Sequence, residues 1–226
     1  MRKLLLLPLA LMLLTVVANA REPAGPVWKD TALERAQVLA LLQTLNANLL
    51  SHSSATQTLQ EWCDAHRMAA EPKIVAHRVL GEDKPLPTAD RELLGIGPDE
   101  PVRYRRVRLA CGDWVLSDAD NWYVPSRLTP EMNEQLDRTD VPFGTVVKSL
   151  GFHRQTLSAG LLWSPLPNGW ETDAQLPPPT GKPMAIAPHV LEHSAVLYRK
   201  DNQPFSLVVE TYTANVLAFG PRPIKP

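Results

Sequence analysis

The segment PFSLVVETY, Pro204 to Tyr212, places a carboxylate in the middle of an apolar stretch. Its alternation is typical of a β-strand, with Glu210 among the side chains of one face. An ionised carboxylate is rarely buried without a partner, because its desolvation costs several kcal/mol. We therefore expect Glu210 to meet a cationic side chain, a ligand, or both.

A second predicted strand, residues 102–111, supplies candidate cations. Its two faces carry Val102, Tyr104, Arg106, Arg108 and Ala110 on one side and Arg103, Arg105, Val107, Leu109 and Cys111 on the other. An arginine on the face shared with Tyr104 and Ala110 is a candidate partner for a carboxylate on a neighbouring strand. The alternatives are a solvated strand face for the arginines and a purely structural ion pair for Glu210.

The remaining elements must position these side chains. Periodicity and capping residues predict helices over residues 31–50, 54–68, 88–96 and 128–138, with a short helix within 141–152. Strands are predicted over residues 73–80, 102–111 and 114–125 and in a terminal hairpin within 194–219, with turns at Gly112-Asp113 and near Asp201-Asn202. Helices followed by hairpins indicate an α+β fold with a single antiparallel sheet and flanking helices.

The first 20 residues have the organisation of a secretory signal peptide. Arg2 and Lys3 precede an apolar run, and Ala18-Asn19-Ala20 is a small-residue cleavage site. Cleavage after Ala20 leaves a single domain of residues 21–226, periplasmic or secreted and without a stable membrane anchor. Removing Arg2 and Lys3 leaves 21 basic and 24 acidic residues, a net charge of −3. This charge lacks the excess of basic residues that is typical of nucleic-acid binding.

Three further features of the sequence bear on the fold or on the function. Cys63 and Cys111 permit one disulfide in an exported protein, or two separate buried thiols. The stretch from Ser164 to Pro183 is rich in proline and too irregular for a core element. The segment HVLEH, residues 189–193, matches a zinc-protease pattern, but that chemistry needs a helix and a strand is predicted to follow at once. His193 is expected at the surface or in a pocket wall.

Four short motifs in order make the chain resemble the chorismate lyases and the related ligand-binding UTRA domains of transcription regulators. The motifs are Ser54-Ala55-Thr56 before a helix, RRVRLACGDWVLSDADNWYVP, VPFGTVVKSLGFHR, and the terminal SAVLYRKDNQPFSLVVETY. The resemblance covers roughly residues 45–217. It implies a chorismate lyase-like fold.

The resemblance also implies a site. Arg106, five residues before Cys111, would grip the carboxylate of a small aromatic ligand, and Glu210 would exchange a proton at the opposite end. Other ligand-binding positions of the family are matched by Ser54, Ala55, Thr56, Phe143 and Arg154. The alternative for Arg154 is a solvated loop residue. The implied reaction eliminates pyruvate from chorismate to give 4-hydroxybenzoate, with no metal and no organic cofactor.

The sequence departs from the family at several positions. Leu191-Glu192-His193-Ser194 stands where the lyases carry Trp-x-Arg-Arg-Ser, so two cations are lost. Asp120, or a near neighbour, replaces a glycine, and an aspartate near an anionic ligand would repel it. Export also separates the protein from cytoplasmic chorismate. Three functions stay open: an exported lyase, a non-catalytic periplasmic protein that binds a small carboxylate, and a structural or interaction domain.

Overall fold

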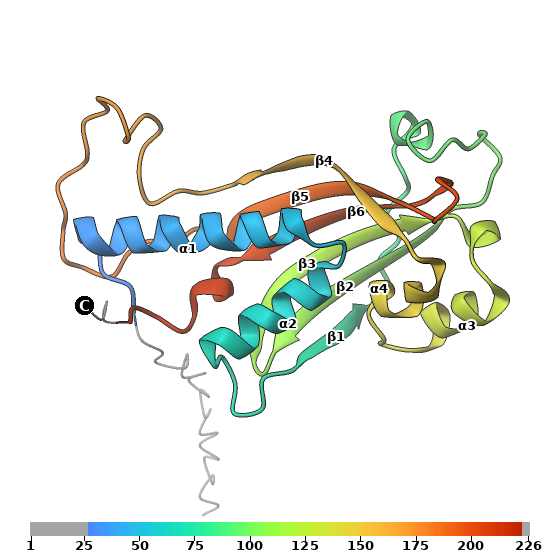
Figure 1. The fold of residues 1–226 in the computed structure, drawn as a ribbon, viewed down its shortest axis with the longest axis horizontal. Coiled ribbons are helices and arrows are strands. Elements are labelled where there is room, and N and C mark those ends of the chain that lie inside the picture. The colour runs from blue at the N-terminus through green and yellow to red at the C-terminus, as the bar shows by residue number, and fades with distance from the viewer. Residues whose placement is uncertain (1–26, 223–226) are drawn as a thin grey trace, which may run out of the picture.

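The computed structural model describes residues 27–222, and the predicted signal peptide lies outside them. One antiparallel sheet of six strands, in the order β1-β2-β3-β6-β5-β4, forms the centre of the fold (Figure 1). The strands are β1 (Ile74–Val79), β2 (Arg103–Cys111), β3 (Trp114–Tyr123), β4 (His153–Leu161), β5 (His189–Tyr198) and β6 (Pro204–Thr213). The predicted fold class, a single antiparallel sheet with flanking helices, is confirmed.

Four α-helices accompany the sheet. They are α1 (Ala32–Ser51), α2 (Ala55–His66), α3 (Pro130–Arg138) and α4 (Phe143–Val146). The cap predicted at Ser54 forms, whereas the threonine cap predicted at Thr88 does not. The hydroxyl oxygens of Thr31, Ser54 and Thr129 each accept a hydrogen bond from the backbone N–H three residues ahead. Within residues 27–222, none of the helices combines the length and apolar character needed to cross a bilayer.

The helices pack on one face of the sheet and leave a space between them. Helix α1 contacts β4 and β5, whereas α2 contacts β1 and β2, so the two helices flank the central strands β3 and β6 (Figure 1). Apolar side chains of both helices, including Leu42, Leu45 and Leu59, form the main core with this face. On the opposite face, Leu94 packs against Trp122 and Leu207 and covers one end of the sheet.

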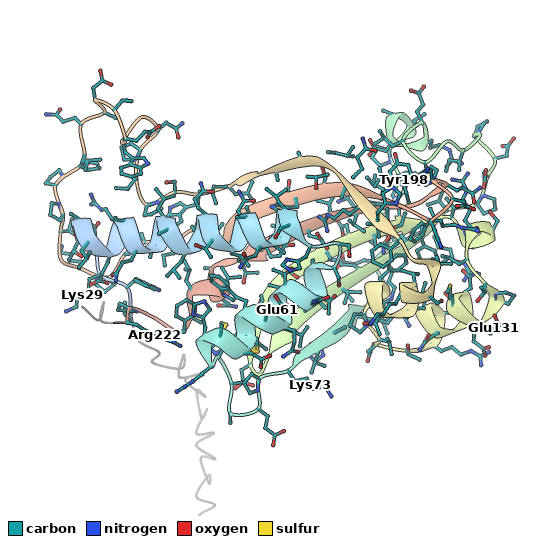
Figure 2. The ribbon with its side chains drawn as sticks, in the orientation of Figure 1. Lys29, Glu61, Lys73, Glu131, Tyr198 and Arg222 are labelled. Atoms are coloured by element: carbon teal, nitrogen blue, oxygen red, sulfur yellow. A yellow bond between two sulfur atoms is a disulfide. The ribbon has the colours of Figure 1, made fainter. Side chains whose placement is uncertain are left out.

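A disulfide ties α2 to the sheet. Cys63 in α2 and Cys111 at the end of β2 are bonded, with their Cα atoms 6.1 Å apart. Of the two interpretations that the sequence left open, the structure has the disulfide. It holds α2 beside β2, where the side chains of the two elements meet (Figure 2).

The proline-rich stretch is irregular, as predicted, but it is anchored to the start of α1. The Arg35 guanidinium donates to the carbonyl oxygen of Pro177 at 2.6 Å and pairs with Asp30. Asp30 in turn accepts a hydrogen bond of 2.7 Å from the Thr180 hydroxyl. This stretch is the orange loop that arches past the first turn of α1 in Figure 1.

Two sequence predictions miss elements of the sheet. Residues 153–161 were not expected to form a strand, yet they make the edge strand β4. The last hairpin begins at His189 rather than near Ser194. Conversely, the helix expected over residues 88–96 is only a 3₁₀ turn, Thr88–Arg91, followed by turns.

Candidate functional site

A small cavity of about 70 Å³ lies on the helix-covered face, over the central strands. Its floor is formed by side chains of β2, β3 and β6, and its cover by the start of α2 and by α4. Cross-strand register aligns Val107, Ala119 and Glu210 in one row and Arg105, Asn121 and Val208 in the next. The cavity therefore has an apolar floor with charged groups at its margins.

Arg105 is a buried cation in the wall of this cavity. It is only 4% exposed, and no carboxylate forms a salt bridge with it within residues 27–222. Its Nη2 donates to the carbonyl oxygens of Thr139 and Val141, whereas Nε and Nη1 have no partner among the described residues. Burial, with the nearby Arg78 charge, lowers the pKa of Arg105 to about 10, so the group stays charged at neutral pH.

Glu210 also lines the cavity, and its partner is Arg154. Nη2 of Arg154 lies 2.6 Å from Oε2 of Glu210, and their side chains are 6% and 13% exposed. The Tyr212 hydroxyl donates to the same carboxylate oxygen at 3.4 Å. Burial first, and then the Glu210 charge, raise the pKa of Tyr212 well above its ordinary value, so this hydroxyl keeps its proton.

The start of α2 adds a third source of positive potential. Ser54, Ala55 and Thr56 line the cavity, and the Ser54 hydroxyl oxygen caps the helix by accepting from the N–H of Gln57. The first turn leaves N–H groups without intrahelical acceptors, and the helix dipole favours an anion there. All three predicted residues therefore lie at the cavity, and their contact with a ligand stays a prediction.

Small side chains keep the cavity open. Ala55, Ala119 and Gly144 line it, where larger residues would fill the space. Phe143 contributes an aromatic wall, as expected, and its ring lies 5.5 Å from that of Tyr123. At about 70 Å³ the space is well below that of a typical drug-sized site, so it suits a small ligand.

The prediction that Arg106 faces Glu210 is wrong. Arg106 lies on the opposite face of the sheet, where it makes two hydrogen bonds of 2.8 Å to Asp118 and a third to Glu82. The offset of five residues from the buried Cys111 is odd, and an odd offset along a strand reverses the face. Arg105, in phase with Val107 and Cys111, is the arginine that enters the cavity.

Two further expectations change with this geometry. Asp120 lies on the outer face, where it binds Tyr104 and Lys84, so it does not repel an anion in the cavity. His193 is neither at the surface nor in the cavity wall, because it is completely buried beneath α1. The HVLEH pattern lies in β5 rather than in a helix, which removes the basis for a zinc-protease interpretation.

The fold and the cavity define an α+β protein with one antiparallel sheet and a small, cation-lined pocket on its helix-covered face. Among curated proteins, the uncharacterized protein y4mC of Sinorhizobium fredii (strain NBRC 101917 / NGR234) is 58% identical over 198 residues. The alignment spans 87% of this chain and 83% of that protein. The chain therefore belongs to the same family as y4mC. No family model matches the sequence.

Comparison with solved structures gives weaker likenesses. PhnF from Mycobacterium smegmatis has a TM-score of 0.46 at 15% identity, over 73% of this chain and 65% of that chain. Its effector domain gives the same score over 72% of this chain and 90% of that domain. The possible transcriptional regulator YydK from Bacillus subtilis gives 0.38 at 17% identity, over 69% and 63%. The alignments thus span less than two thirds of YydK and of full-length PhnF, and scores below 0.5 support no inference about function.

Proposed function

We propose that the protein binds a small carboxylate in this cavity, with the anionic group held between Arg105 and the first turn of α2. The observation that supports it most strongly is Arg105 itself. A guanidinium that is 4% exposed, with two nitrogens unpartnered among the described residues, is costly unless a ligand completes its hydrogen bonds. A carboxylate fits a guanidinium in a bidentate manner.

The charges of the cavity indicate a monoanion. Arg105 and Arg154 contribute two positive charges and Glu210 one negative charge, which leaves a net charge of +1. One carboxylate neutralises this excess. A cation in the same position would face two arginines, so the site disfavours cationic ligands.

The sheet also gives the ligand a direction. Arg105 and Glu210 lie in adjacent rows and two strands apart, which separates their Cα atoms by about 12 Å. Both side chains line the cavity, with Ala119 between their strands. A ligand that reaches both has a carboxylate at one end and a hydrogen-bonding group, such as a hydroxyl, at the other.

Binding of 4-hydroxybenzoate, compared with the neutral 4-hydroxybenzamide, tests the proposal. The acid should raise the melting temperature and the amide should not, because only the acid supplies the missing charge. Arg105→Met should weaken binding by about 30-fold or more. Arg108→Met, a matched change on the outer face of the same strand, should leave it unchanged. Equal shifts with acid and amide, or full affinity in Arg105→Met, would refute a carboxylate site at Arg105.

Export is part of the proposal. The signal-peptide pattern of residues 1–20 and the Cys63–Cys111 disulfide both support an oxidising compartment outside the cytoplasm. Cell fractionation tests it: we expect the cleaved chain in the periplasmic or secreted fraction. Recovery of the uncleaved chain in the cytoplasm would contradict this compartment.

A second candidate is chorismate lyase-type elimination, favoured by the Glu210 carboxylate in the cavity wall. In that reaction the ether C–O bond and a ring C–H bond break, the ring becomes aromatic, and the released enolpyruvyl group takes up a proton to give pyruvate. Incubation with chorismate should then yield 4-hydroxybenzoate and pyruvate in equal amounts, and Glu210→Gln should abolish both. Absence of product above the uncatalysed rate, with 4-hydroxybenzoate still bound, would leave the binding function alone.

A further inference from the structure

His193 is the cross-strand neighbour of Glu210 but is not one of the residues that line the cavity. The two residues face each other across β5 and β6, on the side of the sheet that α1 covers. His193 is 0% exposed and does not line the cavity. Its side chain extends to α1, where it contacts Asn46.

Asn46 of α1 fixes the proton on the His193 ring. Nε2 of His193 lies 2.8 Å from the amide oxygen of Asn46. An amide oxygen only accepts, so Nε2 carries the ring proton and Nδ1 has a bare lone pair. Nδ1 is buried and has no partner among residues 27–222. It is therefore a vacant proton acceptor next to the anion-binding pocket.

The charged groups around His193 come from two strands. Arg154 of β4 opposes a proton on the ring and Glu210 of β6 favours one. The Tyr212 ring of β6 lies in an edge-to-face arrangement with the His193 ring, with 5.8 Å between the ring centres. Helix α1 has no charged residue after Arg35, so it contributes only the Asn46 amide. Burial first, and then the Arg154 charge, lower the pKa of His193, which keeps the ring neutral at neutral pH.

We propose that His193 couples anion binding in the pocket to the uptake of a proton. An anion in the pocket offsets the Arg154 charge that opposes a proton on the ring, and Nδ1 then takes a proton from solvent. The negative charge of Glu210, the cross-strand neighbour of His193, favours the charged ring. By linkage, binding tightens as pH falls toward the range where histidine titrates, by up to tenfold for each pKa unit of coupling. The coupling rests on the proposed carboxylate site.

Titration calorimetry with 4-hydroxybenzoate in two buffers of different ionisation enthalpy measures the proton taken up. Over about pH 6 to 8, where histidine titrates, we expect uptake that increases as pH falls. Asn46→Asp places a carboxylate on Nε2, which should protonate His193 before the ligand arrives and so abolish the uptake. Asn48→Asp adds the same charge on an exposed position of the same helix and should leave the uptake as in the wild type.

Nitrogen NMR of the free protein provides a readout that needs no ligand. The His193 ring should show the neutral form protonated at Nε2 at pH 7, and the charged form in Asn46→Asp. A doubly protonated ring in the free wild type would overturn the coupling. So would binding without proton uptake, or uptake that persists in His193→Gln, which would place the proton on Glu210. Failure of the wild type to bind any acid, with a neutral His193, would instead refute the carboxylate site and with it the coupling.

Discussion

Replacement of Ala119 by valine should stabilise the protein and abolish ligand binding at the same time. Ala119 lies in the floor of the cavity, between Val107 and Glu210. Valine adds two methyl groups, each about the size of a water molecule, to the floor of the cavity, where the ligand must lie. Burial of this surface contributes about 1–1.5 kcal/mol after some loss to imperfect fit.

For a domain of this size, that gain corresponds to a rise of about 2–6 °C in melting temperature. Differential scanning fluorimetry with and without 4-hydroxybenzoate measures both effects. Ala159→Val, on an exposed position of β4, is the matched control and should keep the full ligand-induced shift. A destabilised Ala119→Val variant would show that the cavity cannot accept the methyl groups, and an undiminished ligand shift would show that the ligand binds elsewhere.

Three other perturbations test interactions that stabilise the fold around the cavity. Hydrogen bonds from the Arg35 guanidinium and the Thr180 hydroxyl lower the pKa of Asp30 to about 2. The ionised Asp30 therefore stabilises the folded protein above about pH 4, and this contribution is lost as pH falls through about 2. Urea unfolding between these pH values should show a smaller loss of stability in Asp30→Asn than in the wild type, and equal losses would contradict the assignment. Replacing both Cys63 and Cys111 by serine opens a loop of sequence separation 48 and should lower the free energy of unfolding by about 4 kcal/mol, with an unchanged denaturation midpoint as the contrary result. Glu210→Gln leaves Arg154 buried without a counter-charge, which should cost about 3–5 kcal/mol and be partly restored by 4-hydroxybenzoate; a variant as stable as the wild type would show that the ion pair contributes nothing net.

Much of the local structure could be predicted because it depends on residues close in sequence. Thr31, Ser54 and Thr129 cap the helices that follow them, since a hydroxyl oxygen three residues before a free N–H needs no tertiary context. The turn at Gly112 forms where expected, with φ of +55°, a conformation that glycine adopts without strain. Such signals predicted the four α-helices, both hairpins and the strand that carries Glu210, although they also predicted a helix over residues 88–96 that does not form.

The partner of Glu210 could not be predicted in the same way. Arg154 comes from the edge strand β4, which has half-exposed and polar side chains and so lacks the apolar alternation that reveals a strand. Arg105 carried a usable signal, because it is in phase with Val107 and Cys111, the apolar residues that mark the buried face. The resemblance directed attention to Arg106, one residue too far along the strand.

By itself, the sequence determined the four α-helices, five of the six strands, the α+β class, and the presence of a carboxylate on an inward-facing strand. Only the tertiary structure decided that Arg105 stays unpaired, that Arg154 meets Glu210, and that His193 lies between Glu210 and Asn46. The physical reason is the separation in sequence between the residues that interact. Caps and turns are short-range hydrogen bonds, whereas the charge balance of the cavity depends on residues more than 40 positions apart that only the register of the sheet brings together.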